Sequence, residues 1–202
     1  AGRRIADYGA FSVFEVAGDA IPLGDGVEVI ADDSRILLNS GVLDTTLAEI
    51  KALQTPRGEF VGKAMQLVQF SGPIKPEWVA SLEETGAEIV TYLPSNTYLI
   101  YGDANEIARV QRLAGVMREI QWNGAYQAEH RVAPAAAALA QDPQTALAED
   151  IAFSIQLVSD PEMNKSTLGL IDSLRTGKVV NEYDALHYHN IIVPITPADI
   201  YT

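Results

Sequence analysis

The chain has 202 residues, of which 48% are hydrophobic and 20% are charged, and its formal net charge is −13. This balance is typical of a globular protein with one or two folded domains. Nucleic acids and anionic membranes require basic patches on a protein, so the acidic charge argues against both as partners. Cysteine is absent, which excludes disulfides and thiolate metal sites. No run of about 18 apolar residues is present to span a bilayer.

Residues 1–62 are predicted to form a β-rich N-terminal segment. Branched and aromatic residues gather there between Gly and Asp turn signals. The predicted strands cover 10–17, 26–32 and 35–41. A helical stretch at 46–54 follows, and it should end before Pro56 and Gly58.

Residues 63–132 are predicted to form a complete β-α-β-β-α-β module. The first strand ends at Gly72-Pro73, and Pro76 and Gly86 mark the start and the end of the first helix. The helices should bury two apolar stripes, made of Trp78, Val79 and Leu82 and of Ile107, Val110 and Leu113. The remaining elements are predicted as strands at 87–94, 97–103 and 116–122 and a helix at 104–115.

Residues 133–148 are rich in Ala and Pro and are predicted to be a linker with one or two helical turns. The chain then repeats itself, because "QLVQFSGP" (66–73) is similar to "SIQLVSDP" (154–161). The second copy occupies 149–202. It is predicted to contain a helix at 162–177, with Met163, Leu170, Ile171 and Leu174 facing inward, and strands at 178–188 and 190–197.

The element order therefore predicts an α+β fold of tandem ferredoxin-like modules, the second of them incomplete. Residues 198–200 align with 105–107 at the start of a helix, and the second module lacks most of that helix and its last strand. An incomplete module leaves an unpaired strand edge that something must cover. Either the chain is a fragment of a longer precursor, or a neighbouring copy supplies the missing strand.

Residues that carry chemistry are few. His187 and His189 would share a face of a strand, as metal ligands can, but no third ligand has a clear spacing. The neighbouring carboxylates are typical of solvated surfaces, and no Gly-x-Ser-x-Gly motif is present. We therefore predict no catalytic residue, no cofactor and no metal site, with His187 and His189 as weak metal candidates.

Several collinear segments resemble the N-terminal pro-region of bacterial secreted subtilisin-like serine peptidases (subtilases). The longest begins "MQLVQFSGPIKPEWVASLEETGAEIV" and covers 65–103, and the resemblance continues loosely through the second module. The other segments are 7–16, 35–46 and 120–134. Subtilases carry Asp-Thr/Ser-Gly, His-Gly-Thr and Gly-Thr-Ser-Met-Ala motifs, and this chain lacks all three.

The resemblance implies a non-catalytic, secreted pro-region that assists folding of a subtilase domain and inhibits it. Such a pro-region would pack its sheet on the protease and place a tail in the substrate cleft as an added strand. Two segments are candidate tails, 125–132 and 197–202. Their candidate binding or cleavage residues are Glu129, His130, Arg131, Ile200, Tyr201 and Thr202.

Two alternatives remain open at this point. The chain could be an extracellular structural protein that assembles with further copies of itself, as an oligomer or filament, through open strand edges. It could also be a tandem regulatory protein that binds small molecules between its modules, a hypothesis that rests on fold analogy alone.

Overall fold

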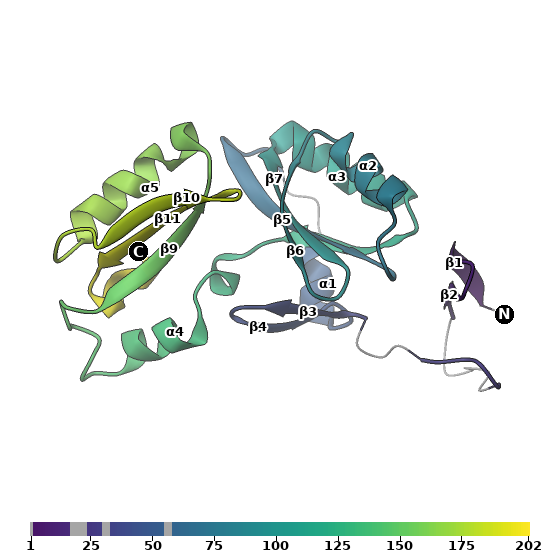
Figure 1. Cartoon of the computed structure of the whole chain (residues 1–202), viewed down its shortest axis with the longest axis horizontal. Helices are drawn as coiled ribbons and strands as arrows, with labels where there is room; N and C mark the ends of the chain where they lie inside the picture. The colour runs from purple at the N-terminus through teal and green to yellow at the C-terminus, as the bar shows by residue number, and fades with distance from the viewer. Residues whose placement is uncertain (1, 17–23, 30–32, 55–57) are drawn as a thin grey trace. The chain divides into compact units, whose positions relative to one another are not determined.

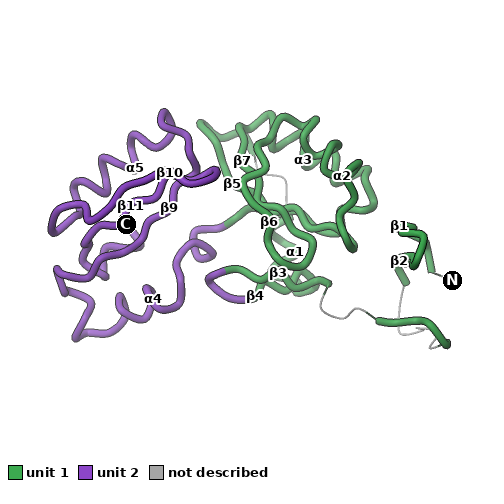
Figure 2. The backbone as a smooth tube through the Cα atoms, in the orientation of Figure 1, with its two compact units in different colours: residues 1–38, 42–126 green, residues 39–41, 127–202 purple. Residues whose placement is uncertain are grey.

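The computed structural model describes residues 2–16, 24–29, 33–54 and 58–202. Over these residues the chain is an α+β protein with five α-helices and eleven strands in small antiparallel sheets (Figure 1). It divides into two compact units, Ala1–Leu38 with Val42–Tyr126 (unit 1) and Asn39–Gly41 with Gln127–Thr202 (unit 2) (Figure 2). Within the described ranges, no helix has both the length and the apolar character needed to cross a membrane.

Unit 1 is built around a four-stranded antiparallel sheet whose strand order is β6-β7-β5-β8. Its elements follow the predicted β-α-β-β-α-β order: β5 (Lys63–Phe70), α2 (Pro76–Glu83), β6 (Glu88–Leu93), β7 (Thr97–Asp103), α3 (Ala104–Val116) and β8 (Ile120–Ala125). The last strand was predicted at 116–122 and lies instead at 120–125. The reason is that α3 continues to Val116 and a turn follows it.

Local sequence signals explain where these helices and turns begin. Pro76 occupies the first turn of α2, where its missing N–H leaves no helical hydrogen bond unmade. Asp103 caps α3, since its carboxylate accepts a 2.9 Å hydrogen bond from the Glu106 N–H and the Glu106 carboxylate accepts one of 2.8 Å from the Asp103 N–H. Ser95 and Asn96 both have positive φ, which suits the tight turn between β6 and β7.

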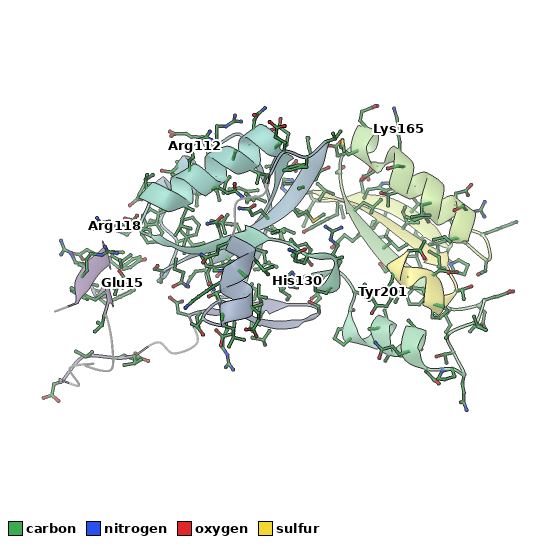
Figure 3. The ribbon with its side chains drawn as sticks, turned by 180° about the vertical axis from the view of Figure 1, so that it is seen from behind. Glu15, Arg112, Arg118, His130, Lys165 and Tyr201 are labelled. Carbon is green, nitrogen blue, oxygen red and sulfur yellow. The ribbon has the colours of Figure 1, made fainter. Side chains whose placement is uncertain are left out.

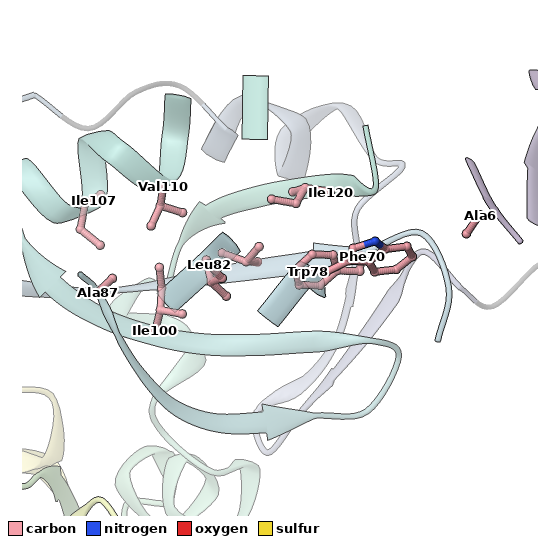
Figure 4. Close-up of a cluster of buried hydrophobic side chains, with 10 residues drawn as sticks. Ala6, Phe70, Trp78, Leu82, Ala87, Ile100, Ile107, Val110 and Ile120 are labelled. Atoms are coloured by element: carbon pink, nitrogen blue, oxygen red, sulfur yellow. The ribbon is translucent and has the colours of Figure 1, made fainter. Parts of the chain in front are cut away.

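One face of this sheet is covered by α2 and α3, which bury the principal core of unit 1 (Figure 4). Phe70 and Trp78 stack with ring centroids 5.7 Å apart. The predicted inward residues Trp78, Leu82, Ile107 and Val110 are buried there and Leu113 packs against them, whereas Val79 is half-buried outside this cluster. The cluster also includes Ala6, Val68, Ala87, Ile100 and Ile120.

The opposite face of the same sheet is covered by the chain's own N-terminal segment (Figure 1). That segment forms β3 (Arg35–Leu38), β4 (Gly41–Asp44), α1 (Ala48–Lys51) and the short 3-10 helix η1 (Ala52–Gln54), and we call it the cap. The Thr45 hydroxyl donates a 3.1 Å hydrogen bond to the Gln69 side chain on β5. The Leu53 carbonyl lies so close to Gly124 on β8 that a side chain at 124 would meet it. The sheet residues on this face are buried: Leu67, Gln69, Leu99, Tyr101 and Trp122.

An N-terminal hairpin of β1 (Arg3–Asp7) and β2 (Ser12–Glu15) also belongs to unit 1. The Tyr8 hydroxyl donates a 2.6 Å hydrogen bond to the Pro73 carbonyl, and Lys75 donates one of 2.6 Å to the Asp7 carbonyl. The strand predicted at 10–17 is shorter in the structure, where it is β2. The strand predicted at 26–32 is wrong for residues 26–29, which form no strand, while 30–32 lie outside the described residues.

Unit 2 contains a three-stranded antiparallel sheet in the order β10-β11-β9. Its elements are α4 (Pro134–Gln141), β9 (Ala152–Val158), α5 (Pro161–Leu174), β10 (Asn181–Ala185), β11 (Tyr188–Pro194) and the 3-10 helix η3 (Pro197–Tyr201). Leu186, in the turn between β10 and β11, has a φ of 55° and is almost fully exposed. Helix α4 gives the predicted linker its two helical turns.

The core of unit 2 lies between α5 and one face of this sheet. Ile171 on α5 is buried with Ile191 and Val193 on β11. The predicted inward stripe of α5 is correct for Ile171 and Leu174 but wrong for Met163 and Leu170, which are 38% and 39% exposed. Leu168 packs against the core instead, because the first part of the predicted stripe lies on a different side of α5 from the core.

The structure also refines the internal repeat. Thr97 is the first residue of β7 and pairs with Gln69 on β5, and Tyr188 is the first residue of β11 and pairs with Val158 on β9. Gln69 and Val158 are therefore equivalent, and they lie 89 positions apart. The match between "QLVQFSGP" and "SIQLVSDP" uses an offset of 88. A shift of one residue moves a side chain to the other face of a sheet, so the offset of 88 cannot preserve the core.

Candidate binding surface on the sheet of unit 2

The sheet of unit 2 has two faces of different character. Phe153, Ile155 and Leu157 of β9 face α5, and they pair with Val193, Ile191 and His189 of β11. The alternate residues point to the opposite face, which we call the polar face. Its polar and aromatic residues are Ser154, Gln156, Asn181, Tyr183, Tyr188 and Asn190. It also carries the apolar residues Ala152, Val158, Ala185, Ile192 and Pro194.

Hydrogen bonds between strands hold the side chains of the polar face in place. The Gln156 side-chain amide donates a 3.1 Å hydrogen bond to Oδ1 of Asn190, and Nδ2 of Asn190 donates one of 3.4 Å to the Tyr183 carbonyl. Asn190 is buried, whereas Ser154, Gln156 and Asn181 are exposed and Tyr183 is 45% exposed. Exposed Tyr and amide side chains on an ordered sheet are suited to contact another protein, since they combine apolar area with hydrogen-bonding groups.

His189 lies on the α5 side of the sheet, between two carboxylates of β10. Its Nδ1 is 2.7 Å from Oδ1 of Asp184, and its Nε2 is 3.1 Å from Oε1 of Glu182. The hydrogen bond with Asp184 is the largest influence on the pKa of His189 and raises it, against a smaller opposing effect of burial. This arrangement stabilises a protonated imidazole and joins β10 to β11 through side chains.

The predicted pairing of His187 with His189 on one strand face is wrong. His187 lies in the turn after β10 and is exposed, while His189 lies within β11. Across the described ranges, no three His, Cys, Asp or Glu side chains are grouped so that they could hold a metal ion. The weak metal hypothesis for these two histidines therefore gains no geometric support.

The first predicted tail forms a short turn rather than an extended strand. Residues Ala128–His130 make the 3-10 helix η2, and Nδ1 of His130 accepts a 3.1 Å hydrogen bond from the Gln127 N–H (Figure 3). His130 is buried, and burial lowers its pKa. The flanking Glu129 and Arg131 are exposed.

The second predicted tail is the helix η3 and Thr202. Pro197 is buried, and the Ala198 N–H donates a 2.9 Å hydrogen bond to the Ala146 carbonyl. Tyr201 is 58% exposed and Thr202 is exposed, whereas Ile200 is half-buried (Figure 3). The second tail therefore lies within unit 2, whereas the first begins at the end of β8 in unit 1 and continues into unit 2.

A separate open cavity of about 550 Å³ lies between β1 and α2 in unit 1. Four of its charged side chains form two ion pairs, with Arg4 and Asp7 3.0 Å apart and Lys75 and Glu77 3.9 Å apart, and Glu119 also lines the cavity. Lys75 is 26% exposed and the other three side chains are more than half exposed, and such solvent-accessible ion pairs contribute little to stability.

Sequence reasoning missed the polar face, although a partial signal was present. The stretch "SIQLV" alternates polar and apolar residues, as a strand with one exposed face does. Tyr183 and Asn190 could not be assigned to the same face, because that assignment depends on the register between β10 and β11.

Comparison with known proteins identifies one related family. Residues 37–127 match a family described as a domain of unknown function (DUF8729), and this match covers just under half of the chain. It begins within β3 and ends just after β8, so it includes most of the cap and the whole sheet that the cap covers. No curated protein and no solved structure matches the chain.

Proposed function

We propose that this chain is the pro-region of a secreted subtilisin-like serine peptidase, a non-catalytic segment that assists folding of the protease domain and inhibits it. The observation that carries the proposal is the topology of unit 1. Its β6-β7-β5-β8 order with two helices on one face supports the ferredoxin-like arrangement that the resemblance implies. The region with that topology includes 65–103, where the resemblance is strongest.

Unit 2 supports the same proposal as a second, partial ferredoxin-like module. Its β9-α5-β10-β11 elements repeat β5-α2-β6-β7, and both sheets place the first strand beside the third. Asp160 and Pro161 start α5 with a cap and a first-turn proline, as expected for an independently specified helix.

The polar face of unit 2 is the surface that we assign to the protease. A pro-region of this family would pack the open face of its sheet on its partner, but in unit 1 the cap already buries that face. In unit 2, α5 packs on one face of the sheet, and the polar face presents Gln156, Asn181 and Tyr183 to solvent. The net charge of −13 adds a preference for a partner with basic groups at the contact.

Residues 197–202 are the better candidate for the segment that enters the substrate cleft. His130 is buried and hydrogen-bonded within η2, so the tail at 125–132 would lose these contacts on extension. Tyr201 and Thr202 are already exposed. An extended peptide in a protease cleft binds by adding a strand to the enzyme.

Inhibition of a bacterial subtilisin-like peptidase, freed of its own pro-region, tests this function. We expect the purified chain to slow hydrolysis of a chromogenic peptide with slow onset and tight binding. Tyr183→Arg should weaken inhibition by roughly tenfold or more, because it replaces an exposed aromatic contact of the polar face. Tyr92→Arg is the matched control, because Tyr92 is 53% exposed but lies on β6 of unit 1.

Two results would contradict the proposal. One is a chain that is folded by circular dichroism but leaves every such peptidase fully active. The other is equal loss of inhibition in the Tyr183 and Tyr92 variants, which would remove the polar face from the proposed contact.

A further inference from the structure

The strand β9 is an edge strand that carries none of the usual protection against pairing. It pairs with β11 on one side, and among the described residues no strand pairs with its other side. Its seven residues, "AFSIQLV", include no charge, no Pro and no Gly. The ladder with β11 runs through all seven residues without a bulge. Exposed edges of this kind are templates for pairing with another chain.

The other edge strands of the two larger sheets are protected in recognisable ways. β6 carries Glu88 and a bulge between Ile89 and Thr91. The pairing of β8 with β5 also has a bulge, and β10 carries two carboxylates, Glu182 and Asp184. Charges and bulges prevent edge-to-edge association, so their absence from β9 singles out this edge.

We propose that β9 pairs antiparallel with β9 of a second copy of this chain, about a twofold axis at Ile155. Each β9 residue would then lie opposite a partner residue on the same face, with Ile155 opposite the partner's Ile155. Ser154 would lie opposite the partner's Gln156, and Phe153 opposite the partner's Leu157. The apolar residues under α5 extend the core across the interface, and the polar face continues across it uninterrupted.

Unit 1 shows that this fold accepts an antiparallel strand at the corresponding edge. β8 pairs there with β5, and the Gln66 side-chain amide donates a 2.9 Å hydrogen bond to Asn123 across the pair. A twofold contact uses the same surface on both copies and therefore closes as a dimer, not as a filament. One pair of seven-residue strands is a small interface, so the dimer should dissociate on dilution in roughly the micromolar range.

Sedimentation of the purified chain over a range of concentrations tests the proposal. We expect a reversible change from monomer to dimer as the concentration rises. Ser154→Lys should leave the chain folded and monomeric, because it places like charges on both sides of the twofold axis at a strand edge. Ser166→Lys makes the same change in charge at an exposed position of α5 and should leave dimerisation unchanged.

Covalent trapping provides a second measurement. The natural chain has no cysteine, so Ile155→Cys creates a single thiol on the proposed axis, where facing Cα atoms lie close enough for a disulfide. We expect oxidation to convert this variant to a covalent dimer much faster than Ala185→Cys, at an exposed position on the protected strand β10.

Several outcomes would overturn the inference: a wild-type chain that is monomeric at every concentration, larger assemblies in place of a dimer, a dimer that survives Ser154→Lys, or equal crosslinking of the two cysteine variants. The inference does not depend on protease inhibition. A chain that inhibits a subtilisin-like peptidase as a strict monomer would retain the proposed function and lose only the dimer.

Discussion

Two aspartates show how the surroundings of a single side chain set its effect on stability. Asp33 is half-buried, and burial raises the pKa of its carboxyl despite a 2.8 Å hydrogen bond from Asn96. At Asp44, hydrogen bonds from the Thr46 hydroxyl and N–H to the carboxylate lower its pKa. A raised carboxyl pKa gives stability that is lost as the pH rises through it, whereas a lowered pKa gives stability that is lost as the pH falls.

The same substitution should therefore have opposite effects at these two positions. At pH 7, Asp33→Asn should stabilise unit 1, because an amide oxygen can still accept the hydrogen bond from Asn96 without burying a charge. Asp44→Asn should destabilise it slightly. Urea unfolding at pH 7 and at pH 3 measures both, and the effect of Asp33→Asn should shrink at pH 3, because the raised pKa of Asp33 leaves its carboxyl largely protonated there. If both substitutions stabilise unit 1 at pH 7, or both destabilise it, the prediction is contradicted.

His189 should make the stability of unit 2 depend on pH near neutrality. Its folded-state pKa lies above the ordinary value of about 6.5. The stabilisation from its carboxylate partners is therefore fully present below about pH 6.5 and is lost as the pH rises through the folded-state pKa. In NMR titrations, we expect Asp184→Asn to lower the pKa of His189 and Glu182→Gln to lower it less. An unchanged pKa in both variants would show that these carboxylates do not hold the imidazole.

At the scale of an element, packing of the cap on the sheet predicts different stability costs for substitutions at two neighbouring residues of β3. Ile36 is fully buried, whereas Leu37 is 47% exposed on the other side of the same strand. Ile36→Ala should cost about 2–4 kcal/mol of unfolding free energy, because it leaves a cavity in the core. Leu37→Ala should change stability by less than about 0.5 kcal/mol. Chemical denaturation followed by fluorescence measures both, and similar costs for the two would show that the cap is not packed on the sheet.

Much of the element order could be predicted from the sequence, but the layers could not. The Pro76 start, the Asp103 cap and the apolar stripes of α2 and α3 are local signals, and the helices follow them. That residues 33–54 cover the second face of the sheet depends on long-range contacts, such as the one between Thr45 and Gln69, which no local pattern encodes. The polar face was missed for the same reason, since a shift of one residue in register would reverse it.

At the scale of the whole molecule, the two units have separate cores of unequal size. Among the described residues, unit 2 buries only five hydrophobic side chains, namely Val158, Ile171, Ile191, Val193 and Ile195. Unit 1 buries far more and has a sheet covered on both faces. A small core supplies little stabilisation, so unit 2 should unfold at a lower denaturant concentration than unit 1.

The positions of the tryptophans allow this difference to be measured directly. Trp78 and Trp122 are the two tryptophans of the chain, and both are buried in unit 1. Fluorescence should therefore report only the later transition, while circular dichroism should begin to change earlier as α5 and its sheet unfold. Coincident transitions by both probes would show that the chain unfolds as one cooperative body.

The hairpin turn at Leu186 has a consequence for protein engineering. A leucine with a φ of 55° pays a backbone penalty that Gly or Asn would largely avoid, and its side chain is 95% exposed and contributes little packing in return. Leu186→Gly should therefore stabilise unit 2 by roughly 1 kcal/mol of unfolding free energy and raise its melting temperature. Ala185→Gly, at the neighbouring position, should lower the melting temperature. A single substitution in the turn of this hairpin should thus stabilise unit 2, the less stable of the two units.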